Sequence, residues 1–325
     1  MITIAVAYNL FIADRETFCS AKTIQYYEKN LGFFLDFLYS DVPNCSSGSD
    51  MAILPDKIMS DYIRMLRHKP RFSRHPFAAP SEVTIKNTTI RTYCRAVKAF
   101  LNYCNEEFDL SFKTNVKIPK DDSEEKVPLY QEEAMEIDKL FSLKTETGLR
   151  NYCIVHLMLD AGFRAEEVEA LRLCDIYFDK NIVKIFNTKG EKSRVVLLCP
   201  KLKKNLYTYV MLYRAYTDNL VDKQYSLQPA FARIRGEGYI NYNCIKQLFA
   251  RIKRKTGIAR LTPHLLRHTF ATSYVMGGGN LENLRLFLGH YDYTVTRTYL
   301  HLANTYKMMG ASIYQLDGIF FRTGY

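Results

Sequence analysis

The chain has 325 residues, of which 47% are hydrophobic and 24% are charged. This length is sufficient for two domains with separate cores, and the composition is typical of an ordinary globular protein. The formal net charge is +11. An excess of cations of this size favours a polyanionic partner, nucleic acid first and a membrane surface second.

The sequence excludes several kinds of site and segment. The eight cysteines are scattered, no two have CxxC spacing, and no Cys and His cluster has zinc-site spacing. We therefore expect buried thiols of a reducing cytosol and no bound metal. The apolar segment 1–16 lacks the features of a signal peptide, so we interpret it as a packed segment. No stretch reaches the roughly 18 to 20 apolar residues that span a bilayer, so we expect no membrane association.

Charged residues fall into three blocks along the chain. Residues 62–105 hold nine Lys and Arg against one acidic residue, residues 120–180 hold eight against fifteen, and residues 181–270 hold eighteen against four. Two basic blocks separated by an acidic one suggest two surfaces that grip one polyanion. The alternative is that these Lys and Arg residues only form the solvent-exposed faces of helices.

The first part of the chain predicts an all-helical domain over residues 12–112. Residues 20–40 and 89–107 each place apolar side chains at spacings of three and four, as an amphipathic helix does. Residues 56–68 predict a shorter helix between them. The polar segment 113–128 contains two prolines and no apolar period, so we expect a linker there.

A second domain is expected over residues 129–305, mainly helical with a small antiparallel sheet. Its segments include predicted helices at 130–143 and 150–163. β-Branched runs at 182–186 and 195–198 flank a turn with a Lys-Gly pair, which predicts a β-hairpin. Helices resume at residue 199, and residues 306–325 form a C-terminal tail.

The hairpin and the segment before it contain three candidate side chains. Arg164 comes shortly after a glycine, and Glu167 lies three residues later on the same helix face. Lys189 lies at the expected hairpin tip, from which a flexible cation can reach outward. Alone, the first two could be a surface ion pair and the third an ordinary turn lysine.

Further candidates lie towards the C-terminus. Thr262 is suited to cap a helix that the run Gly277–Gly279 would end. In that helix, His264 and Arg267 are three residues apart on one face. His290 follows a glycine that would terminate another helix. Each of these three could equally be a satisfied helix or cap residue.

The order Arg, Lys, His-x-x-Arg, His, Tyr makes the chain resemble the tyrosine recombinase family, also called phage integrases, and in particular its short Xer-like members. The resemblance rests on the segments AGFRAEEVEALRLCDI, TKGEKSRVVLL, TPHLLRHTFAT and LGHYDYTVTRTYLHL. In that family the nucleophile lies nine residues after the histidine of the LGH motif. Here this implies Tyr299, and not Tyr291 or Tyr293.

The resemblance implies a DNA recombinase that needs no metal, ATP or other cofactor. Tyr299 would attack a backbone phosphate, form a 3′-phosphotyrosyl link and expel a 5′-hydroxyl, and the reverse attack would rejoin strands through a Holliday junction. Arg164 and Arg267 would stabilise the charge that gathers on the phosphate oxygens.

The remaining roles are also implied by the resemblance. Lys189 would protonate the departing 5′-oxygen, and His264 would take or share the proton of the tyrosine. His290 would donate a hydrogen bond to the scissile phosphate. Glu167 would orient Arg164 or His264 without touching DNA.

The expected partner is double-stranded DNA with a core recombination site. The two domains would close on it as a C-shaped clamp, and the protein would be a monomer or weak oligomer when free and a homo-tetramer on DNA. We expect a cytoplasmic, nucleoid-associated protein that serves a mobile element by integration, excision, inversion or resolution. The tail could be exchanged with a neighbouring subunit or fold back on its own domain.

Candidate phosphate contacts are Arg64, Arg91, Arg95, Lys192, Arg251, Lys253 and Arg260.

Two other functions remain open at this point. One is a DNA-binding regulator with the same fold and an inactive site, and the other is a type IB topoisomerase-like enzyme that relaxes DNA by similar chemistry.

Overall fold

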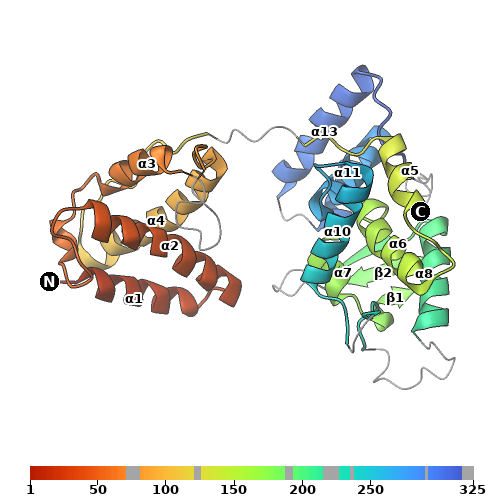
Figure 1. Cartoon of the computed structure of the whole chain (residues 1–325), viewed down its shortest axis with the longest axis horizontal. Coiled ribbons are helices and arrows are strands. Elements are labelled where there is room, and N and C mark those ends of the chain that lie inside the picture. The colour runs from red at the N-terminus through yellow and green to blue at the C-terminus, as the bar shows by residue number, and fades with distance from the viewer. Residues whose placement is uncertain are drawn as a thin grey trace. The chain divides into compact units, whose positions relative to one another are not determined.

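The computed structural model describes residues 1–70, 81–120, 126–186, 193–214, 227–234, 238–289 and 292–316. The chain separates into two compact units, Met1–Glu125 and Lys126–Tyr325, each with its own hydrophobic core (Figure 1). The division falls inside the segment predicted as a linker. Within the described ranges, no helix combines the length and apolarity that crossing a membrane requires.

In the part of the N-terminal unit that the structure describes, all the regular elements are helices joined by loops. Its core contains several aromatic side chains. The ring of Phe11 meets that of Phe100 at 5.5 Å and the ring of Phe34 meets that of Tyr62 at 5.1 Å, both edge to face. Its helices are α1 (Ile4–Glu16), α2 (Ala21–Asp41), the 3-10 helix η1 (Met51–Ile53), α3 (Ile58–His68) and α4 (Asn87–Phe108).

This unit begins before the predicted start at residue 12. Residues 1–16, expected only to be a packed segment, contain α1, which buries Ile4, Ala7 and Phe11 in the common core. Val6 and Leu10 on the same helix are exposed. Because apolar residues lie on both faces of α1, the sequence shows no clear amphipathic period there.

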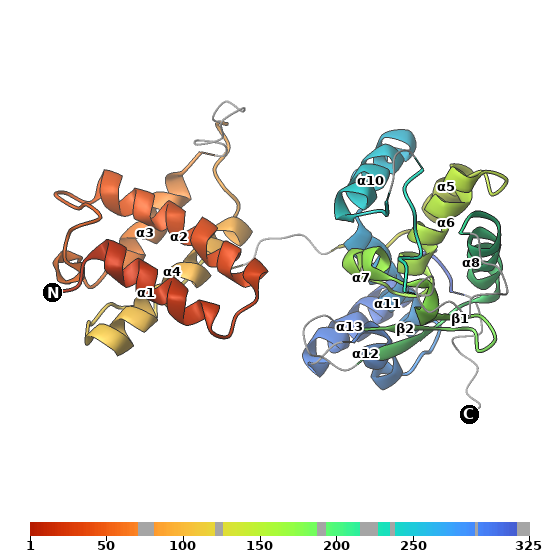
Figure 2. The same ribbon diagram turned by 90° about the horizontal axis from the view of Figure 1, so that it is seen from below.

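The C-terminal unit is mainly helical with a small sheet, as its sequence predicts (Figure 2). Its helices are α5 (Gln131–Lys139), α6 (Glu146–Leu159), α7 (Ala165–Ala170), the 3-10 helix η2 (Leu173–Asp175), α8 (Pro200–Tyr213), α10 (Tyr242–Thr256), α11 (Pro263–Met276), α12 (Leu281–Leu288) and α13 (Tyr293–Met308).

The sheet confirms the predicted hairpin and adds one short strand. Strands β1 (Ile176–Tyr177), β2 (Ile182–Ile185) and β3 (Arg194–Leu197) are antiparallel in the order β1-β2-β3. Ile185 pairs with Arg194 at the end of the β2–β3 ladder. The turn between them, residues 187–192, lies outside the described residues.

Helix α11 is the centre of this unit. The Thr262 hydroxyl accepts the Leu265 N–H at 3.1 Å, Pro263 begins the helix, and Gly277 caps its end, as the sequence predicts. Every residue from 265 to 275 is buried, because α6 and α13 pack against the helix. This position carries Arg267 into the interior.

The described part of the tail folds back on its own unit. Ile313 forms an antiparallel bridge with Tyr130, and the Tyr314 N–H donates to the Leu129 carbonyl at 3.0 Å. The Tyr314 hydroxyl also donates to the Asp160 carboxylate at 2.6 Å. Residues up to 316 are therefore docked within the same chain, and the tail beyond them lies outside the description.

Candidate active site

Arg164 lies at the N-terminus of α7 and is bound twice by Glu167. The Glu167 carboxylate accepts the Arg164 backbone N–H at 2.7 Å and its Nη1 at 2.9 Å. A glutamate at this position commonly satisfies the free N–H at a helix start. The Arg164 side chain stays 41% exposed, whereas Glu167 is 9% exposed. The sequence predicted that Glu167 would orient Arg164 or His264. In the structure Glu167 contacts Arg164, and the Arg164 guanidinium remains open to solvent.

Arg267 is buried on α11 and holds two backbone carbonyls. Its Nη1 donates to Gly162 at 2.6 Å and its Nη2 donates to Leu288 at 2.5 Å. Gly162 has a φ of 67°, and a Cβ there would lie 2.7 Å from the Phe270 ring, so this turn requires glycine. Burial and the nearby charge of Arg164 lower the pKa of Arg267 to about 9, so it remains a cation at neutral pH.

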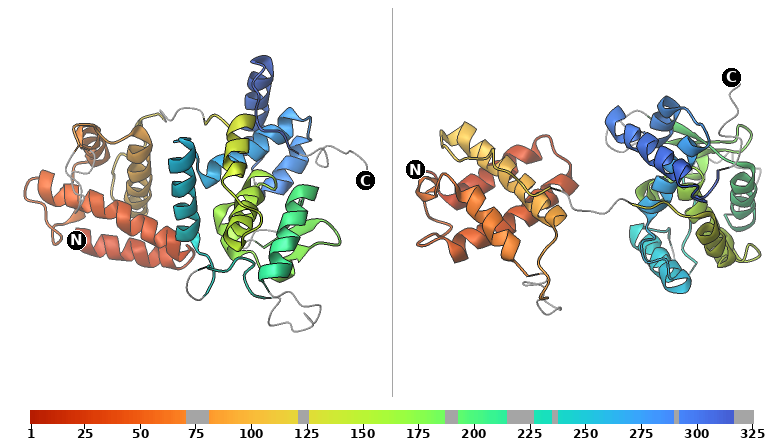
Figure 3. Two further views of the ribbon diagram at one scale, coloured as in Figure 1. Left: turned by 45° about the vertical axis from the view of Figure 1, so that its right-hand side comes forward. Right: turned by 90° about the horizontal axis from the view of Figure 1, so that it is seen from above.

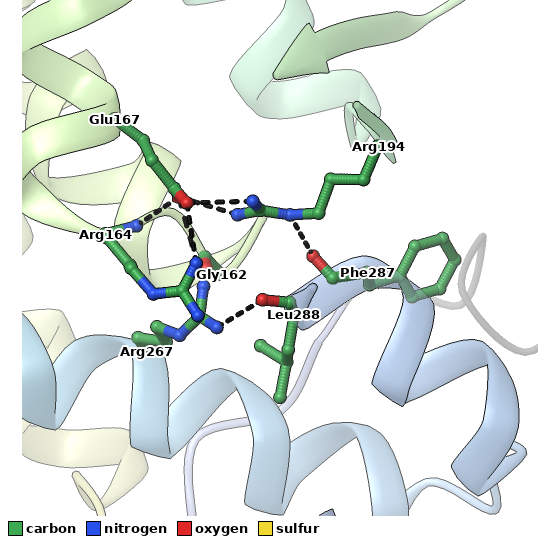
Figure 4. Close-up of polar contacts among 7 residues, drawn as sticks. All are labelled: Gly162, Arg164, Glu167, Arg194, Arg267, Phe287 and Leu288. Atoms are coloured by element: carbon green, nitrogen blue, oxygen red, sulfur yellow. Dashed lines mark hydrogen bonds and ion pairs between the residues drawn. The ribbon is translucent and has the colours of Figure 1, made fainter. Parts of the chain in front are cut away.

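A third guanidinium, which the sequence analysis did not select, completes the cluster. Arg194 is the first residue of β3 and its side chain is 7% exposed. It donates Nη1 and Nη2 to the two oxygens of Glu167 at 2.8 and 2.6 Å, and Nε to the Phe287 carbonyl at 2.7 Å (Figure 4). Burial alone would raise the pKa of Glu167, but the hydrogen bonds from Arg194 lower it below its ordinary value. The carboxylate is therefore charged and fixed in orientation.

Tyr299 lies on α13 and is 7% exposed. Helix α13 packs against α11, and both belong to the blue C-terminal part of the chain in Figure 3. Burial raises the pKa of Tyr299 above its ordinary value of 10, and the charges of Arg267 and Arg164 oppose this rise. The phenol is therefore protonated at neutral pH and lies within the field of both guanidiniums. Tyr293, in the same helix, is 45% exposed, and Tyr291 is outside the description.

Two histidines of α11 differ in their surroundings. His264 is exposed, yet partial desolvation and the nearby cations Lys126 and Arg267 lower its pKa below 6.5, so its neutral ring can accept a proton. His268, which the sequence analysis did not single out, is buried and donates Nε2–H to the Lys126 carbonyl at 2.8 Å. Its ring centroid lies 5.3 Å from that of Tyr299. Burial lowers its pKa to about 4, so it is neutral at physiological pH.

Three predicted residues, Lys189, Lys192 and His290, lie outside the described residues. His290 follows Gly289, which ends α12 in the left-handed conformation with a φ of 60°. The predicted helix-terminating role of this glycine is confirmed.

The predicted DNA contacts of the N-terminal unit lie on α3 and α4. Arg64 is 76% exposed, although its guanidinium lies 3.3 Å from Asp61. Arg95 is exposed. Arg91 is half-buried and donates to the Pro119 carbonyl at 3.3 Å. These three remain predictions, with Arg91 the most engaged in local structure.

The predicted contacts of the C-terminal unit include a basic stretch of α10. Arg251 is exposed and Lys253 is half-buried. Arg251 lines a cavity of about 830 Å³ with Arg150, Arg233 and Lys255. Among the described lining residues of this cavity there is no carboxylate, so its cations face an open space suited to an anion.

Arg260 is placed differently from the other predicted contacts. Its terminal nitrogens donate to both oxygens of Glu133 at 2.6 and 2.5 Å, and it also donates to the Val127 and Pro128 carbonyls. The guanidinium thus fastens the start of the C-terminal unit, and a DNA contact at Arg260 stays a prediction.

The cluster combines fixed positive charge with a protonated phenol. Arg164 and Arg267 supply positive charge in the planar geometry that matches phosphate oxygens. Across the residues that the structure describes, no group of three or more His, Cys, Asp and Glu side chains could hold a metal ion.

Comparisons with known proteins agree with this arrangement. Residues 129–305 match the model of the phage integrase family. The chain is 28% identical over 286 residues to tyrosine recombinase XerA of Saccharolobus solfataricus, which covers 86% of this chain and 82% of that protein. It is also 28% identical over 229 residues to tyrosine recombinase XerC of Chlamydia muridarum, which covers 70% of each. Its fold is similar to that of the Tn1549 transposon integrase in complex with circular intermediate DNA, with a TM-score of 0.72, 16% identity and coverage of 95% of this chain and 100% of that one.

Proposed function

The chain belongs to the phage integrase family and is a tyrosine-type site-specific DNA recombinase, and we propose that Tyr299 is the nucleophile that cleaves and rejoins the strands. The observation that carries this assignment is the burial of the Tyr299 phenol beside Arg267 and Arg164 of the same chain. Each cleavage forms a 3′-phosphotyrosyl bond and releases a 5′-hydroxyl. The bond energy is kept in the ester, so rejoining needs no ATP.

Arg164 and Arg267 stabilise the transition state. The phosphate gathers negative charge on its non-bridging oxygens, and preorganised donors are most effective where such charge develops. Arg164 is exposed enough to meet DNA, and Arg267 is fixed by two carbonyls beneath it. By analogy with other anion-stabilising donors, the loss of either guanidinium raises the barrier by about 3 to 4 kcal/mol.

Two proton transfers complete the chemistry. Tyr299 must lose its proton as it attacks, and His264 is the acceptor, supported by a lowered pKa that keeps its ring neutral. Lys189 protonates the departing 5′-oxygen, and His290 donates a hydrogen bond to the phosphate. These last two roles rest on the family resemblance.

The DNA substrate is a duplex with a core recombination site, which the two units bind as a C-shaped clamp. Support comes from exposed cations on both units, Arg64 and Arg95 on one and Arg251 on the other. Most such contacts would be to phosphates, so affinity should fall steeply with salt and carry little sequence information.

On DNA, the protein acts as a homo-tetramer, and it is a monomer or weak oligomer when free. The cis docking of residues 312–316 supports a free subunit that binds the start of its own tail. Exchange between subunits would then involve later residues of the tail or release of this contact. Because its substrate is DNA, the protein acts in the cytoplasm in association with the nucleoid.

A covalent trapping experiment tests the assignment of Tyr299. Nicked duplexes with randomised core sites would be incubated with wild type, Tyr299→Phe and the matched control Tyr293→Phe, with and without EDTA. We expect wild type and Tyr293→Phe to form a covalent adduct that survives EDTA, and Tyr299→Phe to form none. An adduct with Tyr299→Phe would show that another residue is the nucleophile.

The same substrates separate the two alternative functions. The regulator would form no adduct on any selected site. A topoisomerase-like enzyme would form the adduct and relax plasmids, without strand exchange between duplexes. Holliday junctions formed from two cleaved duplexes are the product that only the recombinase gives.

A further inference from the structure

Glu167 is surrounded by three guanidiniums, and Arg194 makes the closest contacts with it. Arg194 donates two bonds, at 2.8 and 2.6 Å, whereas Arg164 donates one from its side chain at 2.9 Å and Arg267 approaches to 4.0 Å. A bidentate pair fixes the plane of a carboxylate as well as its distance. Together with the Arg164 backbone N–H, which donates to the same carboxylate at 2.7 Å, Arg194 therefore fixes the orientation in which Glu167 meets the Arg164 guanidinium.

Arg194 also holds the end of α12. The last carbonyls of a helix have no partner within it. The Phe287 carbonyl accepts Arg194 Nε at 2.7 Å, and the neighbouring Leu288 carbonyl accepts Arg267 (Figure 4). A Cβ on Gly289 would lie 3.1 Å from Arg194 Cδ, so the two residues are in close contact.

We propose that Arg194 is a positioning residue for DNA cleavage. It orients Glu167, and through Glu167 it orients Arg164. It also holds α12 against Arg267. We assign it no contact with DNA, because all three of its side-chain nitrogens donate to groups within the unit. The inference rests on the proposed function, because Arg164 and Arg267 are the groups assigned to the scissile phosphate.

The test compares Arg194→Lys and Arg194→Ala with Arg172→Ala. Arg172 is a matched control because it makes a similar two-bond pair with Asp175 in the same unit, at 3.0 Å for each bond. Single-turnover cleavage of nicked DNA, DNA affinity and thermal midpoint would be measured for each. Lysine keeps the charge but not the fork, so both Arg194 variants should cleave about 10- to 100-fold more slowly, as positioning residues at other sites do. Affinity should change by less than about 3-fold, and Arg172→Ala should cleave like wild type.

A second substrate separates positioning from general damage. A methylphosphonate at the scissile position removes one negative charge, so cleavage depends less on the guanidiniums. If Arg194 acts through Arg164 and Arg267, Arg194→Lys should cleave this neutral substrate less than about 3-fold more slowly than wild type does. A packing defect would slow both substrates equally.

The inference is overturned if Arg194→Lys cleaves ordinary DNA as fast as wild type, or if its cleavage rate falls below that of wild type by the same factor on both substrates. Either result leaves the proposed function intact when wild type forms the adduct and Tyr299→Phe does not. If wild type forms no adduct with any selected site, the proposed function fails and the role of Arg194 fails with it.

Discussion

The rings of His268 and Tyr299 lie 5.3 Å apart at an angle of 49°, and the same imidazole donates to the Lys126 carbonyl at 2.8 Å. His268 therefore links the first residues of the C-terminal unit to the helix that carries the tyrosine. It also fills the space beside the phenol, which is needed to keep one orientation of the ring.

His268→Ala should reduce both stability and cleavage. The variant leaves a cavity beside Tyr299 and an unpaired carbonyl at Lys126, which together should cost about 2 to 4 kcal/mol of unfolding free energy. His268→Gln can still donate to the carbonyl and should lose less. Urea denaturation and single-turnover cleavage measure the two effects. Full cleavage activity in folded His268→Ala would show that the ring contact does not position Tyr299.

A second prediction concerns the buried ionic cluster of α6. His156 lies between Asp138 and Asp160, 2.7 Å from each. Burial opposes its charge, but the two carboxylates prevail and raise the pKa of His156 to about 9. A base with a raised pKa stabilises the fold fully below its unfolded pKa near 6.5, and this contribution is lost as pH rises through about 9.

The expected loss of unfolding free energy between about pH 6 and 9.5 is about 3 kcal/mol for this group. Urea unfolding of wild type and His156→Gln across this range measures it. The variant should be less stable at neutral pH, because the buried Asp160 carboxylate loses its cation, whereas the half-buried Asp138 keeps Lys201 at 3.0 Å. Its curve should also be flatter. Parallel curves for the two proteins would mean that His156 is neutral in the folded state.

The sequence predicted local features well and long-range contacts poorly. The cap at Thr262, the end of α12 at Gly289 and the β2–β3 hairpin are encoded within a few residues, so turn and cap chemistry was sufficient to predict them. The order of candidate residues led to Tyr299 through a family resemblance, and its role as the nucleophile stays a prediction.

Arg194 and His156 were missed for a physical reason. Arg194 lies in a short β-branched run, and its partners Glu167 and Phe287 are 27 and 93 residues away. His156 lies in an apolar helical segment, where a lone histidine gives no sign of the two carboxylates that it meets in the fold. Neither spacing nor composition specifies such contacts before the helices are packed. The start of α1 was missed because its apolar residues are not confined to one face.

A third prediction concerns the docked tail. The Tyr314 hydroxyl donates to Asp160 at 2.6 Å, and the Ser273 hydroxyl donates to the Tyr314 carbonyl. Tyr314→Phe removes only the first bond and leaves a buried carboxylate less satisfied, so unfolding free energy should fall by about 1 to 3 kcal/mol. Amide hydrogen exchange at Tyr314 and Gln131, whose N–H groups bond across this contact, should become faster. Unchanged exchange at both amides would show that the hydroxyl does not hold the segment.

A fourth prediction follows from the lowered pKa of His264, caused first by desolvation and then by Lys126 and other nearby cations. Its ring is neutral at pH 7 and is protonated only as pH falls below its ordinary value of 6.5. The cleavage rate should therefore be constant near neutrality and decline in acid as the acceptor is lost. In His264→Gln the rate should fall by about 100-fold or more and lose this acid limb. An unchanged acid limb in the variant would assign the titration to another group.

The last prediction tests whether the cavity beside α10 holds a DNA phosphate. Arg251 is exposed there beside three other cations, whereas Lys204 is exposed on α8, on the other side of α6 in Figures 1 and 2. Arg251→Ala should weaken binding to every duplex to a similar degree, because a phosphate contact carries no base information. The slope of log K against log salt should become shallower by about 0.9, the value for one lost contact. Lys204→Ala should leave both affinity and slope unchanged. If Arg251→Ala keeps the wild-type slope, or if Lys204→Ala changes it equally, DNA does not reach this cavity.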